Sequence, residues 1–163
     1  MKIVLAVIIV IVLLVIATLF KNHARLFDPP GPKKRLAVYL TTNTARTADD
    51  HPFPELRTPL FDAEPEVLYD AVKEAAINLG WSILDSDDVE WTLDLGAKTH
   101  FLLFVDDVRV EIRPQVCKDG VTRTALHIHS QSRLGNADFA ANADHVQQLV
   151  KSVHQRLALG FTH

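Results

Sequence analysis

The longest apolar run of the chain lies at its N-terminus. Residues 3–20 carry no charge, and Thr18 is their only polar side chain. As a helix, this run would span roughly 27 Å, close to the hydrocarbon thickness of a bilayer. A cleaved signal peptide is the competing interpretation, but its apolar region would be about 7–15 residues long and would end at small residues. Here the run ends at Leu19, Phe20 and Lys21, so we predict a transmembrane anchor over residues 1–22.

Two later segments have the spacing of amphipathic helices. The first is predicted to begin at Pro65, which suits a first helical turn, and to stop at Gly80. The second runs from about Asp138 to Leu157. Its apolar positions recur on one face and predict a buried stripe, formed by Phe139, Ala143, Val146, Leu149, Val150, Val153 and Leu157.

Strand-like segments surround the first helix. A short edge strand is predicted over residues 58–61, and longer strands over 81–85, 90–95, 99–114 and 121–132. Asp119-Gly120 is a strong hairpin signal between the last two. The order of strand, helix, four strands and helix predicts an α+β domain. Its antiparallel sheet of four to five strands would have both helices packed on one face.

The segment between the anchor and this pattern is irregular. We assign residues 23–35 to a linker, in which the prolines of 28–34 indicate a stiff, extended connector. Residues 35–40 suit a short strand or helix. Residues 41–56 show no period, and Phe53 and Leu56 indicate a loop pinned across the surface. The single α+β domain is therefore expected over residues 36–163.

Composition excludes several classes of protein. A net charge of -3, from 17 basic and 20 acidic residues, gives no electrostatic footprint for nucleic acid. Cys117 is the one cysteine, which rules out a disulfide framework and suits a small buried hydrophobe. There is no Gly-rich phosphate loop, zinc signature or G-x-S-x-G motif. We therefore predict no cofactor and assign no catalytic residue.

The histidines are possible metal ligands by residue type. His127 and His129 would share one strand face, with His100 and His145 elsewhere. A metal site needs a third ligand at fixed geometry, and two exposed histidines on a sheet surface are far commoner. We predict no metal site.

The charges flanking the anchor bear on its orientation. Lys2 lies before the apolar run, and five cations follow it, namely Lys21, Arg25, Lys33, Lys34 and Arg35. The positive-inside rule then places the soluble domain on the cytoplasmic side of the membrane. A periplasmic domain is the alternative, because short N-terminal anchors also serve as export signals.

The first polar signal is the pair Asp106-Asp107 within an apolar strand. If Leu102, Phe104 and Val108 face the core, alternation points Asp106 inward and Asp107 outward. An inward carboxylate would need a cationic or hydrogen-bonding partner. The alternative is a bulge at which both carboxylates are solvated.

The second polar signal lies between the last strand and the last helix. Alternation places Ser132 on the inner face and Arg133 on the outer face, while Gly135 suits a turn with positive φ. Asn136 or Asp138 suits the helix N-cap, and Asn142 borders the buried stripe, where it should bond something specific.

Two interpretations of Arg133 remain. It forms an anion or polar-ligand site with the helix N-terminus, or it pairs with Asp106 or Asp138 while Ser132 and Asn142 tie the loop to the sheet. We favour an ion pair with Asp106.

Three motifs occur in order along the chain. They are "YLTTNTARTADDHPFPEL", "FVDDVRV" and "SQSRLGNAD", the last followed by Asn142. With these motifs the chain, from about Gly31 onward, resembles the domain-of-unknown-function family 1499, which occurs in bacteria and plastids. The resemblance implies a small α+β domain, often behind a signal or anchor. Members of the family commonly carry Gly where Ala140 stands and a basic residue where Val105 stands, so this chain departs from the family at both positions. The resemblance also implies a polar signature, formed by Asp106, Asp107, Ser132, Arg133, Gly135, Asp138 and Asn142.

Two functions are open from the sequence. One is a non-enzymatic, single-pass membrane module that meets the bilayer through residues 3–20 and binds a membrane-protein partner or a lipid-like ligand. Its candidate ligand-binding residues are Asp106, Asp107, Ser132, Arg133, Asp138 and Asn142. The alternative is a membrane-tethered hydrolase that uses Asp106 and Asp107 with Arg133.

Overall fold

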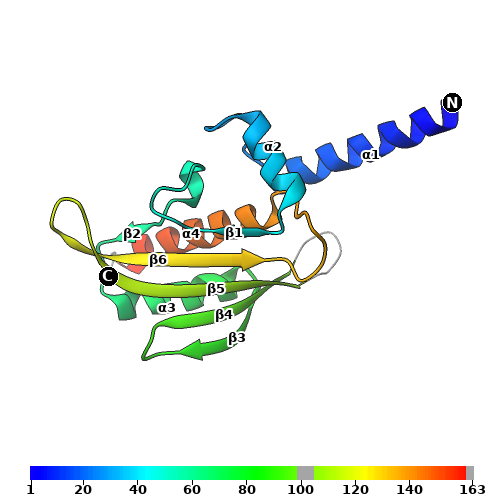
Figure 1. Ribbon diagram of the computed structural model, residues 1–163. Helices are drawn as coiled ribbons and strands as arrows, with labels where there is room; N and C mark the ends of the chain where they lie inside the picture. The colour runs from blue at the N-terminus through cyan, green and yellow to red at the C-terminus, as the bar shows by residue number, and fades with distance from the viewer. Residues whose placement is uncertain (99–104, 161–163) are drawn as a thin grey trace.

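The computed structural model describes residues 1–98 and 105–160. An apolar helix, α1 (Lys2–Lys21), projects from an α+β domain with the N-terminus at its far end (Figure 1). Within the described residues, α1 is the one helix long and apolar enough to cross a membrane, a property that a signal sequence shares.

The domain is built on an antiparallel sheet, which confirms the predicted fold class. Four long strands form most of it: β3 (Ser82–Asp87), β4 (Thr92–Lys98), β5 (Val105–Val116) and β6 (Thr122–Gln131). Two short strands, β1 (Thr44–Arg46) and β2 (Leu60–Phe61), both pair with β6. The order β1-β6-β5-β4-β3 makes β3 an edge strand. The hairpin predicted at Asp119-Gly120 joins β5 to β6, and Gly120 has a φ of +79°.

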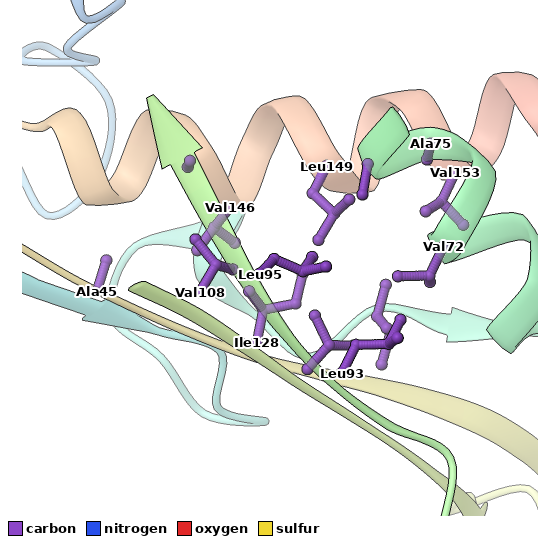
Figure 2. Packing of buried hydrophobic residues seen from close by; sticks show 14 of the residues in the cluster. Ala45, Val72, Ala75, Leu93, Leu95, Val108, Ile128, Val146, Leu149 and Val153 are labelled. Atoms are coloured by element: carbon purple, nitrogen blue, oxygen red, sulfur yellow. The ribbon is translucent and has the colours of Figure 1, made fainter. Parts of the chain in front are cut away.

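Two helices cover one face of the sheet, as predicted. They are α3 (Pro65–Asn78), which ends just before Gly80 at a φ of +74°, and α4 (Ala141–Gly160). Their apolar stripes meet alternate side chains of β4, β5 and β6, and Figure 2 shows Val72 of α3 and Leu149 of α4 directed toward those of the sheet. The opposite face of β4 and β5 carries charged side chains that are partly exposed, such as Asp94, Arg109 and Glu111.

The segment before the sheet is folded. Helix α2 (Pro32–Thr41) begins inside the range expected to be linker. The connector before it is a turn, because the Gly31 N–H donates to the Asp28 carbonyl at 2.8 Å. The expectation of an extended connector was therefore wrong: hydrogen bonding from Arg35 to the carbonyls of Asp28 and Pro29 folds it back.

The loop over residues 41–56 is pinned as expected. Phe53 and Leu56 are buried, and the latter ends a short 3-10 helix, η1 (Pro54–Leu56). This loop also contains β1, which sequence periodicity did not indicate.

The C-terminal end of α1 is attached to the domain. Leu19 is only 4% exposed and belongs to the domain core. Just after the helix, the Asn22 side-chain amide donates to the Phe139 carbonyl at 2.9 Å, and His23 Nδ1 lies 3.1 Å from Asp144 Oδ1. These contacts hold the end of α1 against the start of α4.

Candidate functional site

Asp106 and Asp107 lie on opposite faces of the sheet. Regular pairing of β5 with β4 places Asp106 opposite Ala97 and Asp107 opposite Gly96, without a bulge. Asp106 is 2% exposed beneath α4, whereas the side chain of Asp107 is 54% exposed. The alternation predicted from the sequence is confirmed. Leu102, Phe104 and His100, which that analysis also used, lie outside the described residues.

Arg133 pairs with Asp107, and the expected ion pair with Asp106 was wrong. Its Nε lies 3.0 Å from Asp107 Oδ2, and its Nη2 bonds the other carboxylate oxygen. The physical reason is alternation: with Ser132 on the inner side, Arg133 points to the outer face that Asp107 also occupies. This half-exposed pair lies apart from the buried residues and forms no anion site with the helix.

Asn142 joins the loop, the sheet and α4, as predicted. It is fully buried. Its amide donates to the Asn43 carbonyl at 2.8 Å and contacts Ser132 Oγ at 2.9 Å. Its carbonyl oxygen accepts from Ser130 Oγ at 2.6 Å. These bonds satisfy a buried polar side chain, so Asn142 and Ser132 tie the loop to the sheet.

Asp138 rather than Asn136 caps α4. Its carboxylate accepts from the backbone N–H groups of Ala140 and Asn142 at 2.9 and 3.1 Å. Burial is the largest influence on its pKa and raises it, against the lowering effect of these hydrogen bonds. Ala140 has a φ of +71°, the region that favours glycine, which agrees with the Gly that the family resemblance implies at this position.

The buried carboxylate of Asp106 is only partly paired. His145 Nδ1 lies 3.7 Å from Asp106 Oδ2, beyond hydrogen-bonding distance, and Oδ2 accepts no hydrogen bond within the described part of the chain. Burial raises the pKa of Asp106 to about 6; the Ser132 hydroxyl acts to lower it, and the neighbouring Asp138 acts to raise it. A carboxylate of this kind is a frequent mark of a functional site.

Ser130, His145 and Asp106 are the residue types of a hydrolytic triad, but their geometry differs from one. Ser130 Oγ and Asp106 Oδ2 approach the same ring nitrogen, His145 Nδ1, at 3.4 and 3.7 Å. A triad requires the base to use opposite ring nitrogens for its two partners. Ser130 is also fully buried and donates to Asn142, so this arrangement does not activate it for attack.

A cavity of about 630 Å³ lies where α1 meets the domain. One wall comes from α1, including Leu14, Ala17 and Thr18. The domain contributes Asp106, Ser132, Asp138 and His145, and Trp81, which packs edge-on against the His145 ring with centroids 5.5 Å apart. The cavity thus combines an apolar wall with buried polar groups, which is typical of small-molecule sites.

Sequence reasoning missed three parts of this cavity. His145 was set aside although it lies one turn after Asn142 on the same helical face. The sequence patterns assign no functional role to Trp81, which belongs to the core and also lines the cavity, and they indicate an anchor alone for residues 1–22. The signal for His145 was available in its spacing from Asn142, which places both residues on one face of the helix.

The remaining candidates lie elsewhere. His127 and His129 are on the outer sheet face, and within residues 1–98 and 105–160 no group of three His, Cys, Asp or Glu residues could hold a metal ion. Cys117 is half-buried in the β5–β6 hairpin rather than in the core.

The family described as "Protein of unknown function (DUF1499)" matches residues 32–153 of the chain. The match covers well over half of the chain, so the chain belongs to this family, and the resemblance drawn from its motifs is confirmed. No curated protein matches it.

Proposed function

We propose that this member of the DUF1499 family is a membrane-anchored, non-enzymatic module that binds a lipid-like ligand in the cavity between α1 and the domain. One observation carries the proposal: the cavity has a wall from the apolar helix and polar groups from the domain. Leu14 lies roughly 9 Å along the helix from Phe20. With α1 in a bilayer, the wall would extend below the membrane surface, where an amphipathic ligand presents its acyl part.

Retention of α1 is part of the proposal. A cleaved signal sequence would remove the Leu19 side chain from the core and open one side of the cavity. Intact mass measurement of the membrane fraction should find the full chain of 18.2 kDa. A shorter chain lacking α1 would contradict retention.

Lipid binding is tested by blocking the apolar wall. Ala17→Trp introduces a bulky ring into the cavity lining, and Ala6→Trp is the matched control on an exposed, lipid-facing part of α1. Native mass spectrometry of the full chain in mild detergent should show a bound lipid in the wild type and in Ala6→Trp, and little in Ala17→Trp. Equal lipid content in all three, or none in any, would overturn the proposal.

We place the domain on the cytoplasmic side of a bacterial inner membrane. Arg35 is a buried structural residue, so the flanking charge that supports this orientation reduces to four cations, against Lys2. Cys117 provides the test, because it is the one cysteine. An impermeant maleimide should label it in lysed but not in intact spheroplasts, and labelling of intact spheroplasts would indicate a periplasmic domain.

The hydrolase hypothesis gains no support from the geometry. It requires Asp106 and Asp107 to act with Arg133, and these side chains face opposite sides of the sheet. A membrane-protein partner stays a prediction that no described contact favours.

A further inference from the structure

The polar end of the cavity contains a buried hydrogen-bond acceptor with unmet capacity. Asp106 is almost fully buried and lines the cavity, yet its Oδ2 accepts no hydrogen bond within residues 1–98 and 105–160. His145 Nδ1 at 3.7 Å is near enough for electrostatic attraction only. Leaving a buried carboxylate oxygen without a donor is costly, and a donor supplied by a ligand in the cavity would relieve that cost.

The surroundings favour a donor that carries positive charge. Asp138 is a second carboxylate in the same lining, and its charge disfavours the ionised form of Asp106. Besides Asp144, the lining also holds the cations Lys21 and Lys98, while Arg133 is engaged by Asp107 on the outer face. A hydroxyl would supply a hydrogen bond but no compensating charge, whereas an N–H cation would supply both.

We infer that the cavity recognises a primary ammonium group, presented by the headgroup of an ethanolamine-type phospholipid, with Asp106 as its acceptor. This inference rests on the proposed function. The acyl part would lie along Leu14 and Ala17 of α1, and the phosphodiester matches the cationic Lys98 in the same lining. A choline headgroup has no N–H to donate, and a headgroup without a cation leaves the carboxylates unpaired.

The experiment compares two lipids that differ only in the headgroup. Fluorescent phospholipids with identical acyl chains and either an ethanolamine or a choline headgroup are titrated into the full chain in detergent at pH 7.5. The ethanolamine lipid should bind about tenfold more tightly or better, as for one charge-assisted hydrogen bond. Asp106→Asn should bring the two affinities to within about twofold. Asp107→Asn, the neighbouring carboxylate on the outer face, should keep the preference.

The outcomes separate this inference from the proposed function. If neither lipid binds, or Ala17→Trp leaves binding unchanged, the proposed function fails. If both lipids bind equally and Ala17→Trp weakens both, lipid binding stands and ammonium recognition is overturned. A preference that survives in Asp106→Asn would also overturn it, because Asp106 would not be the acceptor.

A further arm identifies the source of the ammonium group. Ethanolamine without acyl chains should fail to displace the fluorescent lipid at concentrations at which the unlabelled ethanolamine lipid displaces it. Equal displacement by the free amine would overturn the lipid headgroup as the source while supporting ammonium recognition.

Discussion

The domain buries two acidic side chains in very different surroundings. The side chain of Glu55 is 4% exposed and accepts two hydrogen bonds from the guanidinium of Arg35, which is fully buried. Arg35 also donates to backbone carbonyls and to the Tyr39 hydroxyl, and it stacks 4.3 Å from the Phe53 ring centroid. Asp106 is equally buried, but the imidazole of His145, with Nδ1 3.7 Å from Oδ2, is too distant for a hydrogen bond.

The difference distinguishes a structural carboxylate from a candidate ligand group. Arg35 lowers the pKa of Glu55 against the raising effect of burial, so that pair is self-sufficient. Burial raises the pKa of Asp106, and within residues 1–98 and 105–160 no guanidinium pairs with it as Arg35 pairs with Glu55. A buried charge that is fully paired ties elements together, whereas one that is partly paired beside a cavity keeps capacity for a ligand.

The largest effect is expected when the cation of the Arg35–Glu55 pair is removed. Arg35→Met leaves Glu55 buried and unpaired, and the free energy of unfolding should fall by about 3–5 kcal/mol. Urea denaturation of the full chain in detergent measures the loss. In the control, Arg35→Met combined with Glu55→Met should recover part of it. A loss below about 1 kcal/mol would mean that the pair does not hold α2 to η1.

The opposite effect is expected at the unsatisfied carboxylate. Burial raises the pKa of Asp106 in the folded protein to about 6, above its ordinary value of 3.8. Ionisation of Asp106 therefore destabilises the fold. The destabilisation is absent below about pH 3.8, grows as the pH rises, and is complete above about pH 6. Without added lipid, Asp106→Asn should be more stable than the wild type at pH 7.5 by roughly 1–3 kcal/mol.

This gain should disappear as the pH falls toward 4. His145 and Asp138 lie close to Asp106 in both proteins, so the difference between wild type and variant isolates Asp106. Asp107→Asn, on the solvated face, is the matched control and should show no such trend. A wild type more stable than Asp106→Asn at pH 7.5 would make Asp106 a structural residue like Glu55.

The smallest effect is expected at the exposed pair. Both side chains of Arg133–Asp107 are about half exposed, and such pairs contribute about 0–1 kcal/mol. Arg133→Ala should therefore change the unfolding free energy by less than about 1 kcal/mol, measured as above. It should also leave lipid binding unchanged, and a large loss of either would restore Arg133 to the site.

Periodicity predicted the sheet, α3 and α4 because it records which side of an element is buried. It also placed Asp106 inward and Arg133 outward. It could not identify the partner of Arg133, which depends on the side chain across the sheet on the same face. Nor could it find the cavity, because α1 meets the domain through residues such as Asn22 and Phe139, 117 positions apart in the chain.

Arg35 shows a second limit of prediction from the sequence. Its position among the cations after the apolar run suggested a role in membrane orientation. Its burial depends on Glu55, 20 residues later, and on the fold of the connector. A charge count along the chain cannot separate a solvated cation from one enclosed by the domain.

The attachment of α1 has a practical consequence for any water-soluble version of the domain. A chain that starts after Lys21 would keep the sheet, α3 and α4, yet it would lose Leu14, Ala17 and Thr18 from the cavity and Leu19 from the core. Such a fragment would expose fresh apolar surface at the start of α4 and would have an open groove instead of a cavity. Its failure to retain a lipid would therefore describe the truncation and not the intact protein.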